Sequence, residues 1–205
     1  MNNVDHRTMA AWIRAVAMVL GLACTAPVLT AGQGAKVSAA DYAPKRMPDG
    51  KQWTTINLNV SADESSCYDD SEQNCRRYGR LYTWQAAQRI CPVLGDGWRL
   101  PTNEEWRQLG SHFGGIRQES ADLGKAAYTA LMTGGRSGFN AVLGGGRNDQ
   151  DKQYARIDAH GFYWTSSESG PDRAWFYNFG TGAQSFGRHE HGEKLGAFSV
   201  RCVRE

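Results

Sequence analysis

The sequence lacks an excess of charge of either sign. Its 205 residues include 23 Lys and Arg and 21 Asp and Glu, which gives a formal net charge of +2. The two signs are interspersed, so no basic stripe marks a surface for nucleic acid or for an anionic membrane. We therefore expect neither nucleic acid nor a lipid surface as the main partner.

Several motifs of enzymes and metal proteins are also missing. The chain has no Gly-x-Ser-x-Gly, no EF-hand spacing and no Cys-x-x-Cys pair. Gly144-Gly145-Gly146 is followed by Arg147 and not by Gly-Lys-Thr, so we expect a tight turn there and no phosphate loop. The sequence thus predicts no catalytic residues and no metal centre, and the protein is not expected to be an enzyme.

Long hydrophobic runs are scarce, and the clearest one lies near the start of the chain. Arg7 and Arg14 precede an apolar stretch at 15–23, followed by small residues, which is typical of a secretory signal. The run is too short to span a bilayer comfortably. The signal could be cleaved at either of two positions. One is near Ala31, and the other is before Cys24, with lipid attached to that cysteine.

This signal sets the expected organisation and location. We expect a signal segment at 1–31, or one ending before Cys24, then a flexible linker at 32–47 and one domain at 48–205. The protein would be exported to the cell envelope. If Cys24 is lipidated, we expect it at the outer membrane or cell surface with the lipid as its membrane contact. Otherwise it would be periplasmic or secreted.

Four cysteines remain for the folded domain, an even number in an oxidising compartment: Cys67, Cys75, Cys91 and Cys202. They allow three pairings. We favour Cys67 with Cys75, which closes a short polar loop, and Cys91 with Cys202, which ties the middle of the domain to its last strand.

The composition and local patterns indicate a loop-rich α+β fold. The chain has 24 Gly, seven Trp, eight Tyr and seven Phe. Three short helices are expected. One lies at 83–91, the second begins at a capping box formed by Thr102 and Glu105, and the third lies around 119–132. The segment 61–77 is polar and is predicted to be a solvated loop. Short strands are expected at 51–59, 139–143, 162–167, 174–179, 183–188 and 198–203.

Several separated motifs occur in a fixed order along the domain. They are Cys67-Tyr68-Asp69-Asp70, Tyr78-Gly79-Arg80-Leu81-Tyr82-Thr83-Trp84, Gly97-Trp98-Arg99-Leu100-Pro101-Thr102, Tyr163-Trp164-Thr165-Ser166-Ser167-Glu168 and Arg201-Cys202-Val203. Together they resemble the Fibrobacter succinogenes major paralogous domain. That family looks like a relative of the C-type-lectin-like fold shared with formylglycine-generating enzymes. The resemblance implies this fold, with two or three short helices, short antiparallel strands and two disulfides.

The resemblance also limits the expected chemistry. The Glu-Pro-Asn and Trp-Asn-Asp signatures of calcium-dependent lectins are absent, and disulfide-bonded cysteines leave no reactive pair for formylglycine generation. No cofactor is expected apart from an optional structural calcium ion. Its oxygen ligands could come from 148–151 together with Asp158, although a polar turn is favoured there.

Residues 163–204 further resemble the variable region of target proteins that are diversified by retroelements. This resemblance implies a fixed frame that displays altered side chains toward a protein or glycan ligand. The expected ligand-binding residues are Arg173, Phe176, Asn178, Ser185, Phe186, Arg188, His189 and His191. Exposure is expected for Arg173, Phe176, Asn178, Phe186, Arg188 and His189, and burial for Trp175 and Phe179.

An alternative function is a metal-dependent envelope enzyme that uses His189, His191 and Glu193. Alternate residues of a strand lie on one face, so these three side chains could hold a metal ion with a bound water. Two solvated histidines on a surface strand are the favoured interpretation. A ligand-binding domain without catalysis therefore remains the leading hypothesis.

Overall fold

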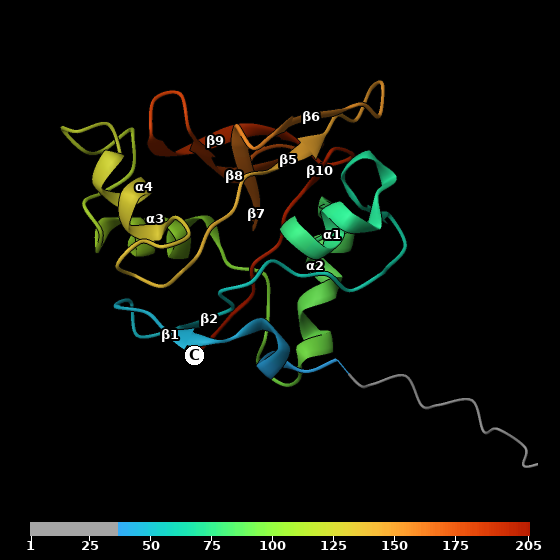
Figure 1. Cartoon of the computed structure of the whole chain (residues 1–205), viewed down its shortest axis with the longest axis horizontal. Helices are drawn as coiled ribbons and strands as arrows, with labels where there is room; N and C mark the ends of the chain where they lie inside the picture. Colours follow the sequence, from blue (N-terminus) through green and yellow to red (C-terminus); the bar gives the residue numbers. More distant parts are fainter. Residues whose placement is uncertain (1–36) are drawn as a thin grey trace, which may run out of the picture. The chain divides into compact units, whose positions relative to one another are not determined.

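The computed structural model describes residues 37–205. The expected signal segment, the lipidation candidate Cys24 and the first part of the linker lie outside the described residues. The described part combines four short α-helices with two β-sheets, so the predicted α+β class is confirmed (Figure 1). Within 37–205, no helix has both the length and the apolar character that a bilayer span requires.

Ordered structure starts earlier in the sequence than residue 48. A 3-10 helix, η1, spans Ala39–Tyr42, and strand β1 spans Lys45–Arg46, both inside the segment expected to be a linker. Tyr42 and Met47 are buried, and each packs into a hydrophobic cluster. These residues therefore belong to the folded domain.

The smaller sheet joins the beginning and the end of the domain. Its central strand, β2 (Gln52–Trp53), pairs antiparallel with β1 on one side and with β11 (Val203–Arg204) on the other. The strand expected at 51–59 is therefore only two residues long. Beyond it, the Thr54 N–H donates to a carbonyl of the C-terminal segment, that of Cys202.

The larger sheet has eight strands in the order β3-β4-β10-β5-β7-β8-β9, with β6 attached to β5. Its short strands are β3 (Ser65–Ser66), β4 (Leu81–Thr83), β5 (Gly144–Arg147), β6 (Tyr154–Ile157) and β10 (Ala197–Phe198). Its long strands are β7 (His160–Glu168), β8 (Arg173–Gly180) and β9 (Ser185–Glu193), which form two consecutive antiparallel pairs. In Figure 1 the long strands lie at the top, away from β1 and β2.

The prediction of a tight turn at 144–146 is wrong, because these glycines form most of β5. Gly145 has a φ of +65°, and a Cβ there would lie 2.6 Å from the Ala155 carbonyl oxygen and 2.7 Å from the Tyr68 ring. Glycine is needed here because a neighbouring strand and an aromatic ring approach the backbone closely. The strand expected at 139–143 is also wrong, since those residues precede β5 without forming a strand.

Two helices lie where they were predicted, and the expected capping box before the second is confirmed. α2 (Trp84–Ile90) follows Thr83, whose hydroxyl accepts a hydrogen bond from a backbone N–H in the first turn. Before α3 (Asn103–Ser111), the Thr102 hydroxyl accepts from the Glu105 N–H, and the Glu105 carboxylate accepts from the Thr102 N–H. Bonds between side chain and backbone thus fix where both helices start.

The other two helices differ from expectation. α4 (Lys125–Leu131) is shorter than predicted because it begins only after Gly124, which has a φ of 78°. α1 (Glu72–Tyr78) lies in the segment expected to be a solvated loop. Cys75 and Tyr78, three residues apart, share one buried face of α1. The domain therefore has four α-helices and not two or three.

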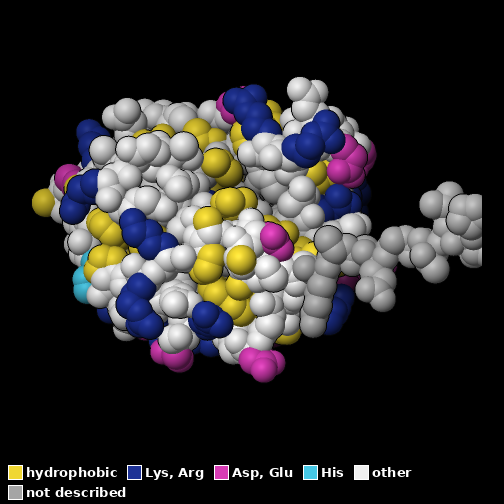
Figure 2. All heavy atoms as spheres, turned by 60° about the horizontal axis from the view of Figure 1, so that its bottom comes forward, with side chains coloured by type: hydrophobic (Ala, Val, Ile, Leu, Met, Phe, Trp, Pro, Cys, Tyr) yellow, Lys and Arg dark blue, Asp and Glu magenta, His cyan; other side chains and the backbone are white. Residues whose placement is uncertain are grey.

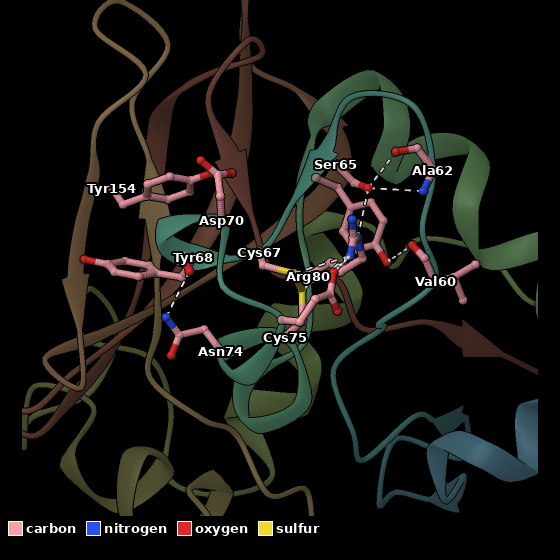
Figure 3. The surroundings of a disulfide bond; sticks show 12 residues. Val60, Ala62, Ser65, Cys67, Tyr68, Asp70, Asn74, Cys75, Arg80 and Tyr154 are labelled. Carbon is pink, nitrogen blue, oxygen red and sulfur yellow. Dashed lines mark hydrogen bonds and ion pairs between the residues drawn. A yellow bond between two sulfur atoms is a disulfide. The ribbon is translucent and has the colours of Figure 1, made fainter.

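Both predicted disulfides are confirmed. Cys67–Cys75 closes a loop with a sequence separation of 8, and Cys91–Cys202 bridges a separation of 111. Figure 3 shows Arg80 beside the first disulfide, with its Nη1 atom 3.3 Å from the Cys67 Sγ atom. The second disulfide fixes the end of α2 to the segment that leads into β11.

Arg201, next to the second disulfide, is fully buried. Its guanidinium donates to the carbonyl oxygens of Thr54, Phe139 and Asn140 and to the Oδ1 atom of Asn57. Among the described residues no carboxylate pairs with it. One cation surrounded by carbonyl dipoles therefore ties the chain after β2 to the chain before β5.

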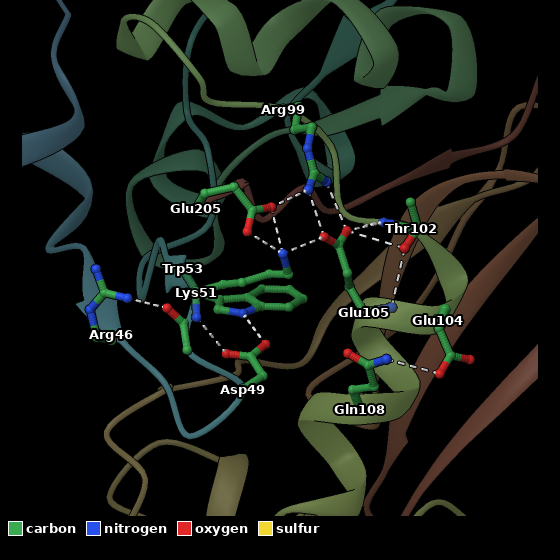
Figure 4. Close-up of polar contacts among 11 residues, drawn as sticks. Arg46, Asp49, Lys51, Trp53, Arg99, Thr102, Glu104, Glu105, Gln108 and Glu205 are labelled. Atoms are coloured by element: carbon green, nitrogen blue, oxygen red, sulfur yellow. Dashed lines mark hydrogen bonds and ion pairs between the residues drawn. The ribbon is translucent and has the colours of Figure 1, made fainter.

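Glu105 also anchors a polar network at the edge of the smaller sheet (Figure 4). Its Oε1 atom lies 2.6 Å from Arg99 Nη2 and 3.5 Å from Lys51 Nζ, and both cations also contact Glu205. Burial alone would raise the pKa of the Glu105 carboxyl. Hydrogen bonds from Arg99 and Thr102 nevertheless lower that pKa to about 2.

Candidate ligand-binding face

The strands β7, β8 and β9 carry different side chains on their two faces. On one of them, which we call the covered face, Tyr163, Tyr177, Phe179 and Phe186 are fully buried. They join Trp106 of α3 in one hydrophobic cluster, and the Trp106 ring lies 5.5 Å from the rings of both tyrosines. The covered face is therefore part of the core.

The opposite face, which we call the open face, stays partly accessible. His160, Phe162, Phe176 and Asn178 are half-buried, and His189 is exposed. Register brings them together, because Phe162 lies opposite Asn178 and Phe176 opposite His189. Three strands thus contribute to one continuous surface.

Aromatic rings form one part of the open face. The rings of Phe162, Phe176 and Phe198 are 5.0 to 5.9 Å apart, centroid to centroid. His160 stacks on Phe162 at 5.5 Å with an interplanar angle of 11°, and His189 stacks on Phe176 at 5.0 Å with an angle of 15°. The two imidazoles therefore stack on the phenylalanine rings, and their ring nitrogens lie at the border of this aromatic group.

Small residues form a depression beside these rings, which we call the hollow. Gly180 lies opposite Ser185 on β9, and Asn178 lies opposite Gly187. These positions leave little side-chain bulk between His160 and His189. The hollow is lined by Arg117, His160, Asn178, Gly180, Gly182, Ala183, Ser185, Gly187 and His189.

The polar groups of the hollow are a guanidinium, two imidazoles, an amide and a hydroxyl. Arg117 Nη1 lies 3.4 Å from Ser185 Oγ, and His160 Nδ1 lies 3.0 Å from Asn178 Oδ1. Desolvation against the protein holds the pKa of His189 below its usual range, and the positive charges of Arg117, His191 and His160 lower it further. Cationic and neutral polar side chains, without a carboxylate, thus surround this depression.

Three of the eight predicted binding residues line the hollow, and a fourth borders it. Asn178, Ser185 and His189 are lining residues, and Phe176 supports the His189 ring. Arg173 is exposed as expected, but it lies near the start of β8 and is not part of the lining. The predicted residues therefore lie on β8 and β9, and only some of them reach the hollow.

The expected exposure of Phe186 is wrong. Its ring is fully buried, 4.5 Å from Phe179 and 5.1 Å from Tyr177. On β9 the small residues Ser185 and Gly187 occupy the open face, so the residue between them points toward the core. Phe186 cannot touch a ligand in this arrangement.

Arg188 and Trp175 also differ from expectation. Arg188 is half-buried, lies 3.7 Å from Glu119 and packs 5.0 Å above the Trp175 ring. Trp175 is half-buried and not fully buried, whereas the predicted burial of Phe179 is confirmed. Both side chains lie on the side of the covered face, so the structure separates them from the hollow.

The expected metal-binding trio on β9 does not converge. Ala174 and Phe176 are two residues apart, whereas their partners Gly192 and His189 are three apart, so β9 carries a bulge. This shift places Glu193, which pairs with Arg173, on the other face from His189. His189, His191 and Glu193 are not among the metal-ligating groups that the described residues form.

The calcium ligands considered for 148–151 and Asp158 are likewise separated. Asp149 lies near Glu193, and this contact raises the pKa of the Glu193 carboxyl. Asp158 instead accepts a hydrogen bond from the Tyr78 hydroxyl at 2.5 Å. These acids therefore do not form one set of oxygen ligands.

Sequence reasoning missed three residues of the open face. His160 and Phe162 share the alternation of Trp164 along β7. Phe162 begins the strand expected at 162–167, and extending that strand by two residues would have included His160. Arg117 precedes α4 and reaches the hollow because its N–H donates to the Phe186 carbonyl at 2.7 Å. No local pattern around Arg117 marks this contact.

Another side of the molecule is shown in Figure 2, where hydrophobic side chains gather in the middle and Lys and Arg surround them. A second concavity is lined in part by Tyr42, Ile56, Val142 and Arg201. The Arg201 donors at this site bind protein oxygens. The open face differs from this concavity, because its hollow has cationic and polar side chains with no carboxylate in the lining.

Comparison with known proteins gives one match. The family model described as the Fibrobacter succinogenes major domain matches residues 37–204. No similar curated protein and no similar solved structure was found. The match covers nearly all of the described residues.

Proposed function

The chain belongs to the Fibrobacter succinogenes major domain family, and from this premise we propose that it is a ligand-binding protein without catalytic activity. The open face of β7, β8 and β9 would bind a protein or a glycan. The observation that carries the proposal is the hollow, with polar side chains beside partly exposed aromatic rings. Such a combination of flat apolar surface and a few fixed donors is typical of recognition sites.

The setting of this function is part of the same proposal. The domain has a C-type-lectin-like fold and is exported by the signal segment, either anchored through Cys24 or released. Two disulfides support an oxidising compartment. A framework of this kind tolerates changes of surface residues because its core and cross-links do not depend on them.

Diversification by a retroelement would act on this surface. Asn178, Ser185 and His189 would vary, whereas Tyr177 and Phe186 would stay constant because they are buried. Sequencing codons 163–204 across many cells of one strain tests this part. Adenine-specific substitutions at the hollow would support it, and a uniform sequence without a nearby copy would contradict it.

A bulky residue in the hollow tests the binding function itself. Asn178→Trp fills the depression at a half-buried position without removing a core side chain. Gln73→Trp, at an exposed position of α1, makes a similar change outside it. Binding of the labelled full chain to arrays of envelope proteins and glycans should be lost in the first variant and kept in the second. Equal binding by both variants would contradict the proposal.

A further inference from the structure

The hollow concentrates positive charge. Arg117, His160 and His189 line it from three different segments. Arg156 adds a further charge, since its Nη1 atom lies 3.5 Å from His160 Nε2. No Asp or Glu side chain is part of the lining. A cluster of cationic donors with no acidic partner favours an anion.

The acidic residues nearest in sequence to His189 and Arg117 contact other side chains. On β9 itself, Glu190 lies 3.6 Å from His191. In the segment that carries Arg117, Glu119 contacts Arg107 at 3.1 Å. The groups that shift the pKa of His189 are cations from β7, from β9 and from the segment before α4, and no carboxylate is among them. An anion would therefore meet no competing acid.

The shape of the hollow indicates what carries the anion. Its floor is made of small residues such as Gly180 and Gly187, and its borders are imidazole rings stacked on phenylalanines. A flat ring can lie on such a floor, and the Asn178 amide and the Ser185 hydroxyl can hydrogen-bond its hydroxyl groups. These features together fit a sugar better than an extended peptide.

We infer that the hollow binds an acidic saccharide unit, a sugar ring that carries a carboxylate or a sulfate group. Arg117 holds the anion, His160 offers a ring N–H, and His189 adds charge when it is protonated. The inference rests on the proposed function, because it names the ligand of the same open face. Carboxylate and sulfate present the same oxyanion chemistry, so the experiment has an arm for each.

The test compares three immobilised oligosaccharides, namely oligogalacturonate, sulfated oligogalactose and neutral oligogalactose. The full chain should bind at least one acidic form about tenfold more tightly than the neutral form, because one charge-assisted hydrogen bond contributes about this gain in affinity. Binding should weaken as pH rises, because protonated His189 adds a positive charge beside the bound anion. The acidic form that binds identifies the anion.

Two variants connect the effect to the hollow. Arg117→Gln removes the charge but keeps the backbone bond of residue 117 to Phe186, and it should abolish the preference for acidic sugars. Arg76→Gln is the matched control at an exposed position of α1 outside the hollow, and it should leave that preference unchanged.

Three outcomes would overturn the inference: the neutral and acidic forms bind equally, neither form binds, or Arg117→Gln keeps the wild-type preference. The proposed function would still stand if Asn178→Trp abolished binding to another ligand on the arrays. It would fail separately if Asn178→Trp and Gln73→Trp bound alike.

Discussion

The covered and open faces of β7, β8 and β9 use the same three strands for opposite purposes. Tyr177 and Phe186 fill the core, while their immediate neighbours Asn178 and Gly187 form the hollow. Both faces are rich in aromatic rings, so composition does not distinguish them. The two faces differ in what lies against them. α3 and α4 supply apolar contacts to the covered face, whereas the open face has small residues and ring nitrogens near solvent.

The comparison shows that stability and recognition can be separated at single-residue spacing. A side chain on the covered face loses packing when it is changed, whereas one that lines the hollow mostly loses a contact with solvent or ligand. Changes at adjacent positions should therefore have very different effects on unfolding. The predictions below test this difference.

The largest difference is expected between two phenylalanines. Phe186→Ala should destabilise the domain by about 3–5 kcal/mol, because it leaves a cavity in the aromatic cluster. Phe176→Ala should cost only about 1–2 kcal/mol, since its ring is half-exposed. Urea unfolding of both variants measures the two values. Similar losses would show that the open face is also part of the core.

The next effect concerns the polar network that holds α3 under the covered face. The folded-state pKa of Glu105 is about 2, below its ordinary value, so its contribution is present above the unfolded pKa and is lost as pH falls through the folded one. Glu105→Gln should cost about 2–3 kcal/mol at neutral pH and remove the acid-induced loss between pH ~4.5 and ~2. Urea midpoints across this range test it. An unchanged pH profile would contradict the assignment.

A smaller difference is expected for polar groups on the two faces. Tyr177→Phe removes the hydrogen bond from the hydroxyl to the Asn103 carbonyl, 3.0 Å away at the start of α3, and should cost about 1 kcal/mol. Asn178→Ala removes only a half-exposed contact with His160 and should cost less than about 0.5 kcal/mol. Thermal unfolding compares the two. A reversed order would contradict the distinction between the faces.

The smallest effect is a change in pH dependence at the open face. The pKa of His189 is lowered in the folded state, so its contribution to stability is present above the unfolded histidine pKa and is lost as pH falls. His189→Gln should make the urea midpoint less sensitive to pH below ~6.5. His112→Gln, at an exposed position after α3, is the control. Equal slopes in both variants would contradict the assignment.

Local patterns explain which features the sequence predicted. The capping box of Thr102 and Glu105 and the alternation around Tyr177 depend on residues close in sequence, and both are confirmed. The disulfide pairing followed from loop lengths. The α+β class and the positions of β7, β8 and β9 were accessible for the same reason.

Longer-range geometry explains the rest. β9 begins at Ser185 and not at 183, because Gln184 has a φ of 46° and ends the turn before it. The bulge after His189 depends on pairing with β8, so the local sequence does not reveal that the three expected metal ligands point to different faces. Arg117 enters the hollow through a contact across the fold. Such features follow from tertiary pairing and not from sequence periodicity.

The position of Arg201 and Cys202 has a consequence for the order of events during folding. Arg201 joins segments near 54 and 140, and Cys202 bonds to Cys91, so the core is incomplete until these late residues have joined it. The helices come earlier in the chain, but without these residues they have no finished core to pack against. The domain should therefore fold as a unit only when residues 200–203 are present, and a product that stops before them should be degraded.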